Sequence, residues 1–415
     1  MNVYFHTFGC KTNQYDTEMV RQAFADSGAT AVDDPACADL AVLNSCTVTA
    51  AGEAKLRTLV RRLARGHVET VVMGCAAAAD DGTIAAVPGV RAVVGGADAR
   101  AVLRAAGLRA PALVPGVRRF TASARAWLKI QDGCDEHCTF CATTIARGAN
   151  RSRPVAELVA EARALAEHHA EIVITGVHIG SYGMDREQGA GSGDQARTTH
   201  NAPRTLGLLL EALIAAVPAV RFRRSSIEAT EIDARIARLL IEAPRHLAAH
   251  VHAPLQSGSD RVLRRMGRHW YTAARYRARL EHLAARLPAF GLGADVMVGF
   301  PGETAADHRA TADLIAALPF TYLHVFPYSP RPGTAAPRLG PAVGSAAARE
   351  RAAELRALGA AKGQAYRAAR RGHRADGVAC GHAGGRVDVL TEDYLTVYLD
   401  GDRWDGTPRL DVVID

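Results

Sequence analysis

Short apolar runs alternate with segments of helical periodicity along most of this chain, and this alternation strongly limits the choice of fold. In the first hundred residues such runs occupy positions 3–9, 40–45, 70–74 and 90–96. Helix-like segments follow them; NQYDTEMVRQAFADSG and AGEAKLRTLVRRLARG each place apolar residues on one face and stop at a glycine. Short apolar strands that are separated by helices predict an open parallel sheet.

The middle of the chain repeats this alternation on a larger scale. Further strands are predicted at 127–133, 171–178, 221–228, 247–256, 292–300 and 322–329. Six βα units predict a complete or partial parallel barrel, whose functional face lies at the carboxyl ends of its strands. The loops there, GVHIGSYG, QSGSD and GFPGET, are rich in glycine, which lets a backbone approach a ligand closely. Residues 185–204, rich in Gly, Ser, Asp and Gln, are predicted to form a mobile surface insertion.

Three cysteines directly follow the first three main strands of the N-terminal region. Cys10, Cys46 and Cys75 are therefore expected at the carboxyl edge of a parallel sheet, beside helix N-termini, where such sheets gather their sites and where a thiolate is favoured. A single buried cysteine at such an edge would be ordinary. Because all three share the placement, we predict one common ligand site. Cys37 and Cys380 lack this placement, and we interpret both as ordinary cysteines.

The composition indicates well-packed domains in a reducing compartment. Apolar residues make up 48% and charged residues 22% of the 415 positions, which argues against global disorder. The start MNVYFHTFGCK is unlike a signal peptide, and Glu211 interrupts the most apolar stretch, so we expect a cytoplasmic protein with no membrane partner. Clustered thiols there indicate metal binding or catalysis rather than disulfides. The net charge of +7 permits a nucleic-acid partner, but an arginine-rich composition alone explains it equally well.

The segment QDGCDEHCTFCATTIARG carries Cys134, Cys138 and Cys141 in the spacing C-x3-C-x2-C. Structural zinc sites and plain ferredoxin clusters each use four protein ligands, and three cysteines on one loop satisfy neither. Three thiolates would hold three irons of a four-iron cluster and leave the fourth iron open. This spacing, on the loop after the first barrel strand, resembles the radical S-adenosylmethionine (SAM) superfamily. The resemblance implies a 4Fe-4S cluster whose open iron is chelated by SAM.

The resemblance extends over nearly the whole chain to the methylthiotransferases of that superfamily. TFGCKTNQYDTE, NSCTVT and VMGC are similar to their N-terminal domain, and RSRP, TGVHIGSYG, RRSSIEATEI, PLQSGSD, GADVMVGFPGET and FPYSPRPGT to their catalytic core. The match implies an auxiliary 4Fe-4S cluster on Cys10, Cys46 and Cys75. One SAM would then yield the radical that removes a substrate hydrogen, and another would methylate the sulfur that is transferred.

The same resemblance suggests three SAM contacts, each with a structural alternative. Phe140 is expected to pack on the adenine, or merely in the core. Gly176 is expected to let the backbone meet the SAM amino group. Glu228 is expected to bind the ribose, or to form a structural ion pair.

Finer motif details concern the substrate. GCKTNQYDTE, and His178 within TGVHIGSYG, resemble the branch that acts on N6-threonylcarbamoyladenosine in tRNA, just 3′ of the anticodon. The branch acting on N6-isopentenyladenosine reads closer to GCQMN, and the branch acting on a ribosomal protein closer to GCPKN. The chain departs from the family after Cys141, where ATTIARG lacks the usual proline. Isopentenyladenosine is the alternative substrate, and an iron–sulfur electron-transfer protein without substrate chemistry is the alternative class.

The C-terminal region predicts an RNA partner. Residues 346–371 read as a helix, and a basic stripe is expected at its end from Lys362, Arg367, Arg370, Arg371 and Arg374. The following strands, with TEDYLTVYLD, resemble the RNA-binding TRAM domain, although a merely solvated basic helix would give the same charges. The family further implies an electron donor of the flavodoxin or ferredoxin type.

These inferences combine into an α/β protein of three parts. We expect an open parallel-sheet domain over 1–112 that holds the auxiliary cluster and a partial (βα)6 radical SAM barrel over 119–350. A small TRAM-like β-barrel is expected over 357–415.

Overall fold

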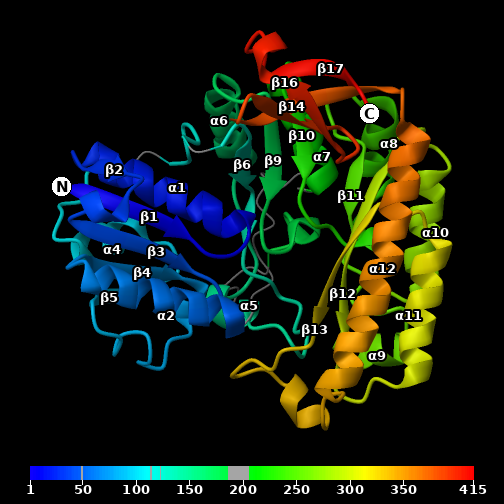
Figure 1. Ribbon diagram of the computed structural model, residues 1–415, viewed down its shortest axis with the longest axis horizontal. Helices are drawn as coiled ribbons and strands as arrows, with labels where there is room; N and C mark the ends of the chain where they lie inside the picture. Colours follow the sequence, from blue (N-terminus) through cyan, green and yellow to red (C-terminus); the bar gives the residue numbers. More distant parts are fainter. Residues whose placement is uncertain (48–49, 113–114, 122, 186–204) are drawn as a thin grey trace, which may run out of the picture.

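The computed structural model describes residues 1–47, 50–112, 115–121, 123–185 and 205–415, so nearly all of the predicted insertion at 185–204 lies outside the described residues. The N-terminal part is a parallel sheet in the order β2-β1-β3-β4-β5 (Figure 1). Its strands are β1 (Asn2–Thr7), β2 (Thr30–Val32), β3 (Leu40–Ser45), β4 (Glu69–Gly74) and β5 (Val90–Gly95). The open parallel sheet is thus confirmed. The short edge strand β2 was missed because it is too exposed to show an apolar run.

Helices cover both faces of this sheet, as the alternation of its buried residues requires. Val42 of β3 packs in the cluster with Phe24 and Val102, whereas the next residue, Leu43, packs in the opposite cluster with Leu59. The helices of this part are α1 (Lys11–Asp26), α2 (Ala50–Arg65), α3 (Cys75–Ala78) and α4 (Ala99–Ala105). Strands β1, β3 and β4 each end just before one of the N-terminal cysteines, at a loop or at the first turn of a helix.

The central part is a partial parallel barrel of six strands, in agreement with the prediction. Two parallel sheets, β10-β9-β6 and β11-β12-β13, are joined by the parallel bridges Phe222–Leu247 and Ser226–His252. The strands are β6 (Ala126–Lys129), β9 (Glu171–Thr175), β10 (Arg221–Arg224), β11 (His250–His252), β12 (Gly291–Val298) and β13 (Tyr322–Pro327).

All six barrel strands end earlier than the sequence predicted, and two of them differ most in their pairing. The strand expected at 127–133 ends at Lys129, and its continuation β7 (Gln131–Asp132) pairs instead with β8 (Arg151–Ser152). The strand expected at 247–256 is reduced to β11; beyond it, Gln256 has a left-handed φ of 60° and makes only an isolated bridge with Val296.

Helices pack on the outside of the barrel. Phe222 joins the large apolar cluster between strands and helices, whereas Arg221 and Arg223, on either side of it, lie on the inner face and bind Glu171. The helices are α5 (Thr143–Arg147), α6 (Val155–Ala166), α7 (Leu206–Ala216), α8 (Ala234–Glu242), α9 (Asp260–Arg265), α10 (Ala273–Ala284), α11 (Ala305–Ala317) and α12 (Ser345–Arg370). Short 3-10 turns occupy Pro35–Cys37, Ile179–Ser181, Ala229–Glu231, Ala336–Leu339 and Gly401–Arg403. Helix α12 is continuous through residues 350–357.

The C-terminal part is an antiparallel half-barrel in the order β16-β15-β14-β17, which fits the expected TRAM-like domain. Its strands are β14 (Arg374–Ala383), β15 (Arg386–Thr391), β16 (Thr396–Asp400) and β17 (Arg409–Val413). The turn between β15 and β16 closes the amino end of the central barrel. There Arg223 donates to the Thr391 carbonyl (2.8 Å), and the buried Asp393 accepts a hydrogen bond from Tyr366 (2.7 Å).

The predicted basic stripe at the end of α12 is wrong in part. Arg370 is only 8% exposed and its guanidinium binds Asp393 (2.8 Å), so it stabilises the junction with the C-terminal part. Lys362 donates to the Ala316 carbonyl, and Arg367 binds Thr396 and the carboxylate of the last residue. Arg371 and Arg374 are the exposed members. Helical spacing alone did not reveal that one face of α12 packs against the half-barrel.

Candidate active site

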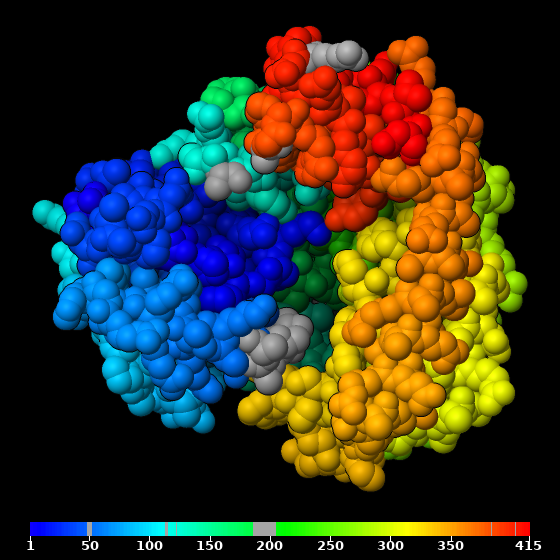
Figure 2. All heavy atoms as spheres, viewed as in Figure 1, coloured from blue at the N-terminus to red at the C-terminus, as the bar shows by residue number. Residues whose placement is uncertain are grey.

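The N-terminal cysteine set, Cys10, Cys46 and Cys75, gathers at the carboxyl edge of the N-terminal sheet, as predicted. Cys10 precedes α1, Cys46 follows β3 and Cys75 begins α3. All three line a cavity of about 520 Å³ whose opposite wall includes Thr175 and Gly176 of the barrel. The set thereby shares one cavity with the barrel mouth, although Cys10 is also exposed to solvent. Figure 2 shows the surface hollowed between the N-terminal part and the segments around β13 and α12.

Polar side chains surround the N-terminal cysteine set. The Asn13 side-chain oxygen lies 3.4 Å from Cys10 Sγ and 4.0 Å from Cys75 Sγ. Arg147 of the barrel donates from Nε to Cys75 Sγ at 3.1 Å. Burial raises the pKa of the Cys75 thiol, and the nearby Arg147 guanidinium opposes that rise. The three sulfur atoms around one cavity suit a metal cluster, which would replace the thiol protons.

Arg147 itself is held by carboxylates from both parts of the chain. Its guanidinium binds Asp16 of α1 (2.9 Å) and Asp132 of β7 (3.0 Å), while Lys129 binds the same two carboxylates. Burial alone would raise the pKa of Asp132, but Lys129 and Arg147 lower it to about 2. This network fixes the N-terminal part against the barrel. The ATTIARG segment, which lacks the proline usual in the family, forms α5, and this helix carries Arg147 at its last position.

The loop cysteine set, Cys134, Cys138 and Cys141, lies on the loop between β7 and α5, at the carboxyl end of the barrel. Cys134 Sγ lies 3.7 Å from His178 Nδ1, and Cys138 Sγ lies 3.5 Å from Arg268 Nη1. Burial raises the pKa of Cys138 to about 12, against the effect of Arg268. Three half-buried thiols on one loop are a suitable donor set for a cluster with one open iron.

Two cationic groups adjoin the loop cysteine set, and sequence reasoning did not assign either of them a contact. Burial disfavours the charge on His178, but hydrogen bonds with Cys134 and Glu231 raise its pKa to about 10. Arg268 binds both Cys138 and Glu228. No local pattern could have found these contacts, because the paired residues are 40 to 130 positions apart.

The three predicted SAM contacts lie around this end of the barrel, and their roles stay predictions. Glu228 is 8% exposed; one carboxylate oxygen binds Arg268, and the other, Oε2, is buried without a hydrogen-bond partner among the described residues. Such an orphaned acceptor fits a ligand hydroxyl. At Gly176 a side chain would collide with Gln131, whose oxygen is 2.8 Å from the ideal Cβ position. The Phe140 ring packs edge-on against Phe300 at 6.3 Å.

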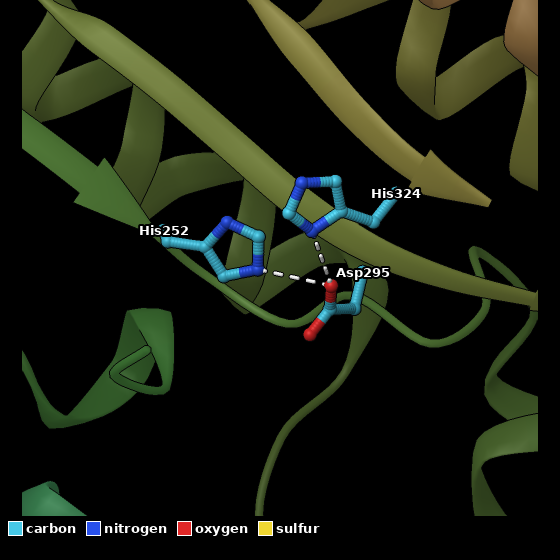
Figure 3. Close-up of side chains that lie close together, drawn as sticks. All are labelled: His252, Asp295 and His324. Atoms are coloured by element: carbon cyan, nitrogen blue, oxygen red, sulfur yellow. Dashed lines mark hydrogen bonds and ion pairs between the residues drawn. The ribbon is translucent and has the colours of Figure 1, made fainter. Parts of the chain in front are cut away.

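A second, smaller cavity of about 170 Å³ lies inside the barrel, and we call it the inner chamber. Its lining comes from all three parts of the chain and comprises Lys11, Arg223, Arg224, Ser225, Ser226, His250, His252, Asp295, Tyr322, His324 and Tyr394. The Asp295 carboxylate accepts hydrogen bonds from His252 Nε2 and His324 Nδ1, both at 3.1 Å (Figure 3). Outside the cysteines, these three side chains are a candidate metal-ligand group among the described residues.

Comparison with known proteins places the two halves of the site in known families. Residues 2–95 match the family described as uncharacterized protein family UPF0004, and residues 128–315 match the radical SAM superfamily. Among the described residues, no helix combines the length and apolar character that crossing a membrane needs.

Several curated relatives are similar over most of their length. The threonylcarbamoyladenosine tRNA methylthiotransferase MtaB of Bacillus subtilis is 38% identical over 86% of this chain and 80% of the relative. The Aquifex aeolicus protein of that name is 30% identical over 97% of both. The tRNA-2-methylthio-N(6)-dimethylallyladenosine synthase of Sorangium cellulosum is 35% identical over 84% of this chain and 76% of its own length.

Among solved structures, the radical SAM methyltransferase TsrM of Kitasatospora setae has a TM-score of 0.58 at 15% identity, covering 80% of this chain and 76% of that chain. This likeness concerns the fold alone. The relatives above share both the N-terminal part and the barrel with this protein. The chain therefore belongs to the radical SAM methylthiotransferase family, together with the threonylcarbamoyladenosine tRNA methylthiotransferases.

Proposed function

We propose that this protein inserts a methylthio group at C2 of N6-threonylcarbamoyladenosine in tRNA, at the position just 3′ of the anticodon. The observation that carries the proposal is that the N-terminal cysteine set and the barrel mouth line one cavity. A protein that only transfers electrons needs no such cavity beside a cluster. The relatives at 38% and 30% identity bear the name of this activity, which supports threonylcarbamoyladenosine over isopentenyladenosine.

In this proposal each cysteine set holds a 4Fe-4S cluster. Bound there, the clusters and SAM would supply a substrate radical and a methylated sulfur. The protein's own residues do the positioning: Arg147 ties the N-terminal set to the barrel, and Glu228 Oε2 is free to accept a hydrogen bond from the SAM ribose. An external electron donor of the flavodoxin or ferredoxin type and a tRNA that already carries the threonylcarbamoyl group would be the partners.

The test removes each cysteine set separately. Replacing the N-terminal set by alanine should leave about half of the reconstituted iron and retain cleavage of SAM to 5′-deoxyadenosine, but yield no methylthiolated nucleoside. Replacing the loop set should also leave about half of the iron and should abolish SAM cleavage. The matched control changes Cys37 and Cys380 to alanine, because both lie outside the two sets, and should behave like the wild type.

Mass analysis of tRNA nucleosides from cells with and without the protein identifies the substrate. Loss of the methylthio form of threonylcarbamoyladenosine on deletion supports the proposal. Loss of the methylthio form of isopentenyladenosine would instead assign the alternative substrate. Normal product formation by the variant without the N-terminal set would refute a role of that set in sulfur delivery.

A further inference from the structure

The inner chamber adjoins the cavity that contains the N-terminal cysteine set. Lys11, Ser225 and Ser226 line both spaces, so a group held in the larger cavity can extend an arm into the chamber. Lys11 follows Cys10 directly and is the first residue of α1. The boundary between the two spaces is therefore next to the place where the sulfur would be transferred.

The chamber is lined mostly by polar side chains, and the charged groups there that lack a counter-charge among the described residues are positive. Glu171, which pairs with the chamber residue Arg223, is also bound by Arg221 and Arg125. Asp295 is bound on one oxygen by two histidines. Lys11 has no hydrogen bond or ion pair with any described residue, and it is half-buried. A buried cation without a partner is costly, which favours a ligand that brings a negative charge.

The chain's other lysines show how unusual this is. Lys129 binds two carboxylates and Lys362 binds a carbonyl, while Lys55 is exposed on α2. Lys11 alone lines a cavity without a described partner. Two more groups of the chamber are unsatisfied among the described residues: Nδ1 of His250, which is 3% exposed, and Nε and Nη1 of Arg224, which is 2% exposed.

We propose that the inner chamber receives the threonylcarbamoyl arm of the substrate adenosine and that Lys11 Nζ binds its carboxylate. The proposal rests on the proposed function and names the part of the chain that selects this substrate. The hydroxyls of Ser225 and Ser226 at the boundary are placed to bond the carbamoyl group. An isopentenyl arm has no polar atoms, so it would leave Lys11 and His250 Nδ1 desolvated without compensation.

A divalent metal on His252, Asp295 and His324 is a weaker reading of the chamber. The three ligand atoms lie within 4.8 Å of one another. However, Lys11 and Arg223 line the same small space and would repel a cation. In addition, the second nitrogen of His252 already bonds the Tyr322 hydroxyl at 2.9 Å, so the group is satisfied as an internal hydrogen-bond network.

The experiment compares two anticodon stem-loop RNAs with the cluster-loaded enzyme. One carries threonylcarbamoyladenosine, and the other carries its carboxamide, which keeps the shape but lacks the charge. We expect the wild type to prefer the carboxylate by about 10- to 100-fold in kcat/KM and in binding measured by fluorescence anisotropy. Lys11→Gln should bring this ratio close to one, and Lys11→Arg should keep most of it. Lys55→Gln, the matched surface control, should retain the full preference.

The outcomes separate the proposals. If Lys11→Gln weakens both RNAs equally and changes the electron paramagnetic resonance spectrum of the auxiliary cluster, Lys11 serves the cluster and the proposal is wrong. It is also wrong if the loaded wild type binds a stoichiometric zinc ion that His324→Ala loses. Failure of the wild type to modify either RNA, with modification of an isopentenyladenosine stem-loop, would overturn the proposed function instead.

Discussion

Glu171→Gln should destabilise the protein more than any surface carboxylate change, because this carboxylate is buried among arginines. Its oxygens accept from Arg221 Nε (2.6 Å), from Arg223 Nε and Nη2 (both 3.0 Å) and from Arg125 Nη1 (3.3 Å). Arg221 and Arg223 also donate to carbonyls of the C-terminal half-barrel. Removing one partner of a buried ion pair costs about 3–5 kcal/mol. We expect the melting temperature to fall by about 6–10 °C, at about 2 °C per kcal/mol for a domain of this size.

The control for this change is Glu211→Gln. Glu211 also binds two arginines, Arg235 and Arg238, but its side chain is 29% exposed, so its loss should cost less than about 1 kcal/mol. Melting is followed by far-ultraviolet circular dichroism. Equal falls for the two variants would refute the argument that burial makes the Glu171 cluster strong.

The pH dependence gives a second readout for Glu171. Burial alone would raise its pKa, but Arg221 and Arg223 lower the pKa well below the ordinary value. In the unfolded chain the pKa of a glutamate is about 4.3. Because the pKa of Glu171 is lower in the folded protein, its ionised carboxylate stabilises the fold above about pH 4.3, and this stabilisation is lost as the pH falls below that value. The free-energy gap between wild type and Glu171→Gln should therefore narrow by about 1.4 kcal/mol per pH unit below that value. A constant gap from pH 7 to pH 3 would contradict the assignment.

Two further changes test the SAM site and the RNA surface. Glu228→Gln should lower SAM affinity about 10-fold in equilibrium dialysis with the loaded enzyme, because Arg268 holds the remaining amide oxygen and an NH2 group, which cannot accept, takes the place of Oε2; unchanged affinity would remove Glu228 as a ribose ligand. Changing the exposed Arg371 and Arg374 together to glutamine should weaken all tRNAs alike and reduce the slope of log affinity against log salt by about 0.7–0.9 per lost phosphate contact. Arg370→Gln should instead lower the melting temperature, since its guanidinium is buried. Equal salt slopes for wild type and the double variant would exclude phosphate contact by this pair.

The sequence by itself determined the element types, the parallel sheet, the partial barrel and the location of both cysteine sets. These features depend on local periodicity and spacing: Cys10, Cys46 and Cys75 each follow an apolar run, and parallel strands end at one edge. Errors remained where no local signal exists, as in the exposed strand β2 and in the early end of β11 at His252.

Only the tertiary structure decided which charged residues are free and which are used. Arg370 and Arg371 are neighbours in sequence, yet one is buried against Asp393 and the other is exposed, because helix α12 packs one face on the half-barrel. Arg147 and Cys75 are 72 positions apart and meet only because two parts of the chain dock. The same holds for Lys11, which has no hydrogen-bond or ion-pair partner within the described part of the chain because of how the segments around the inner chamber pack. Contacts between distant segments are set by packing, and packing leaves no periodic trace in the sequence.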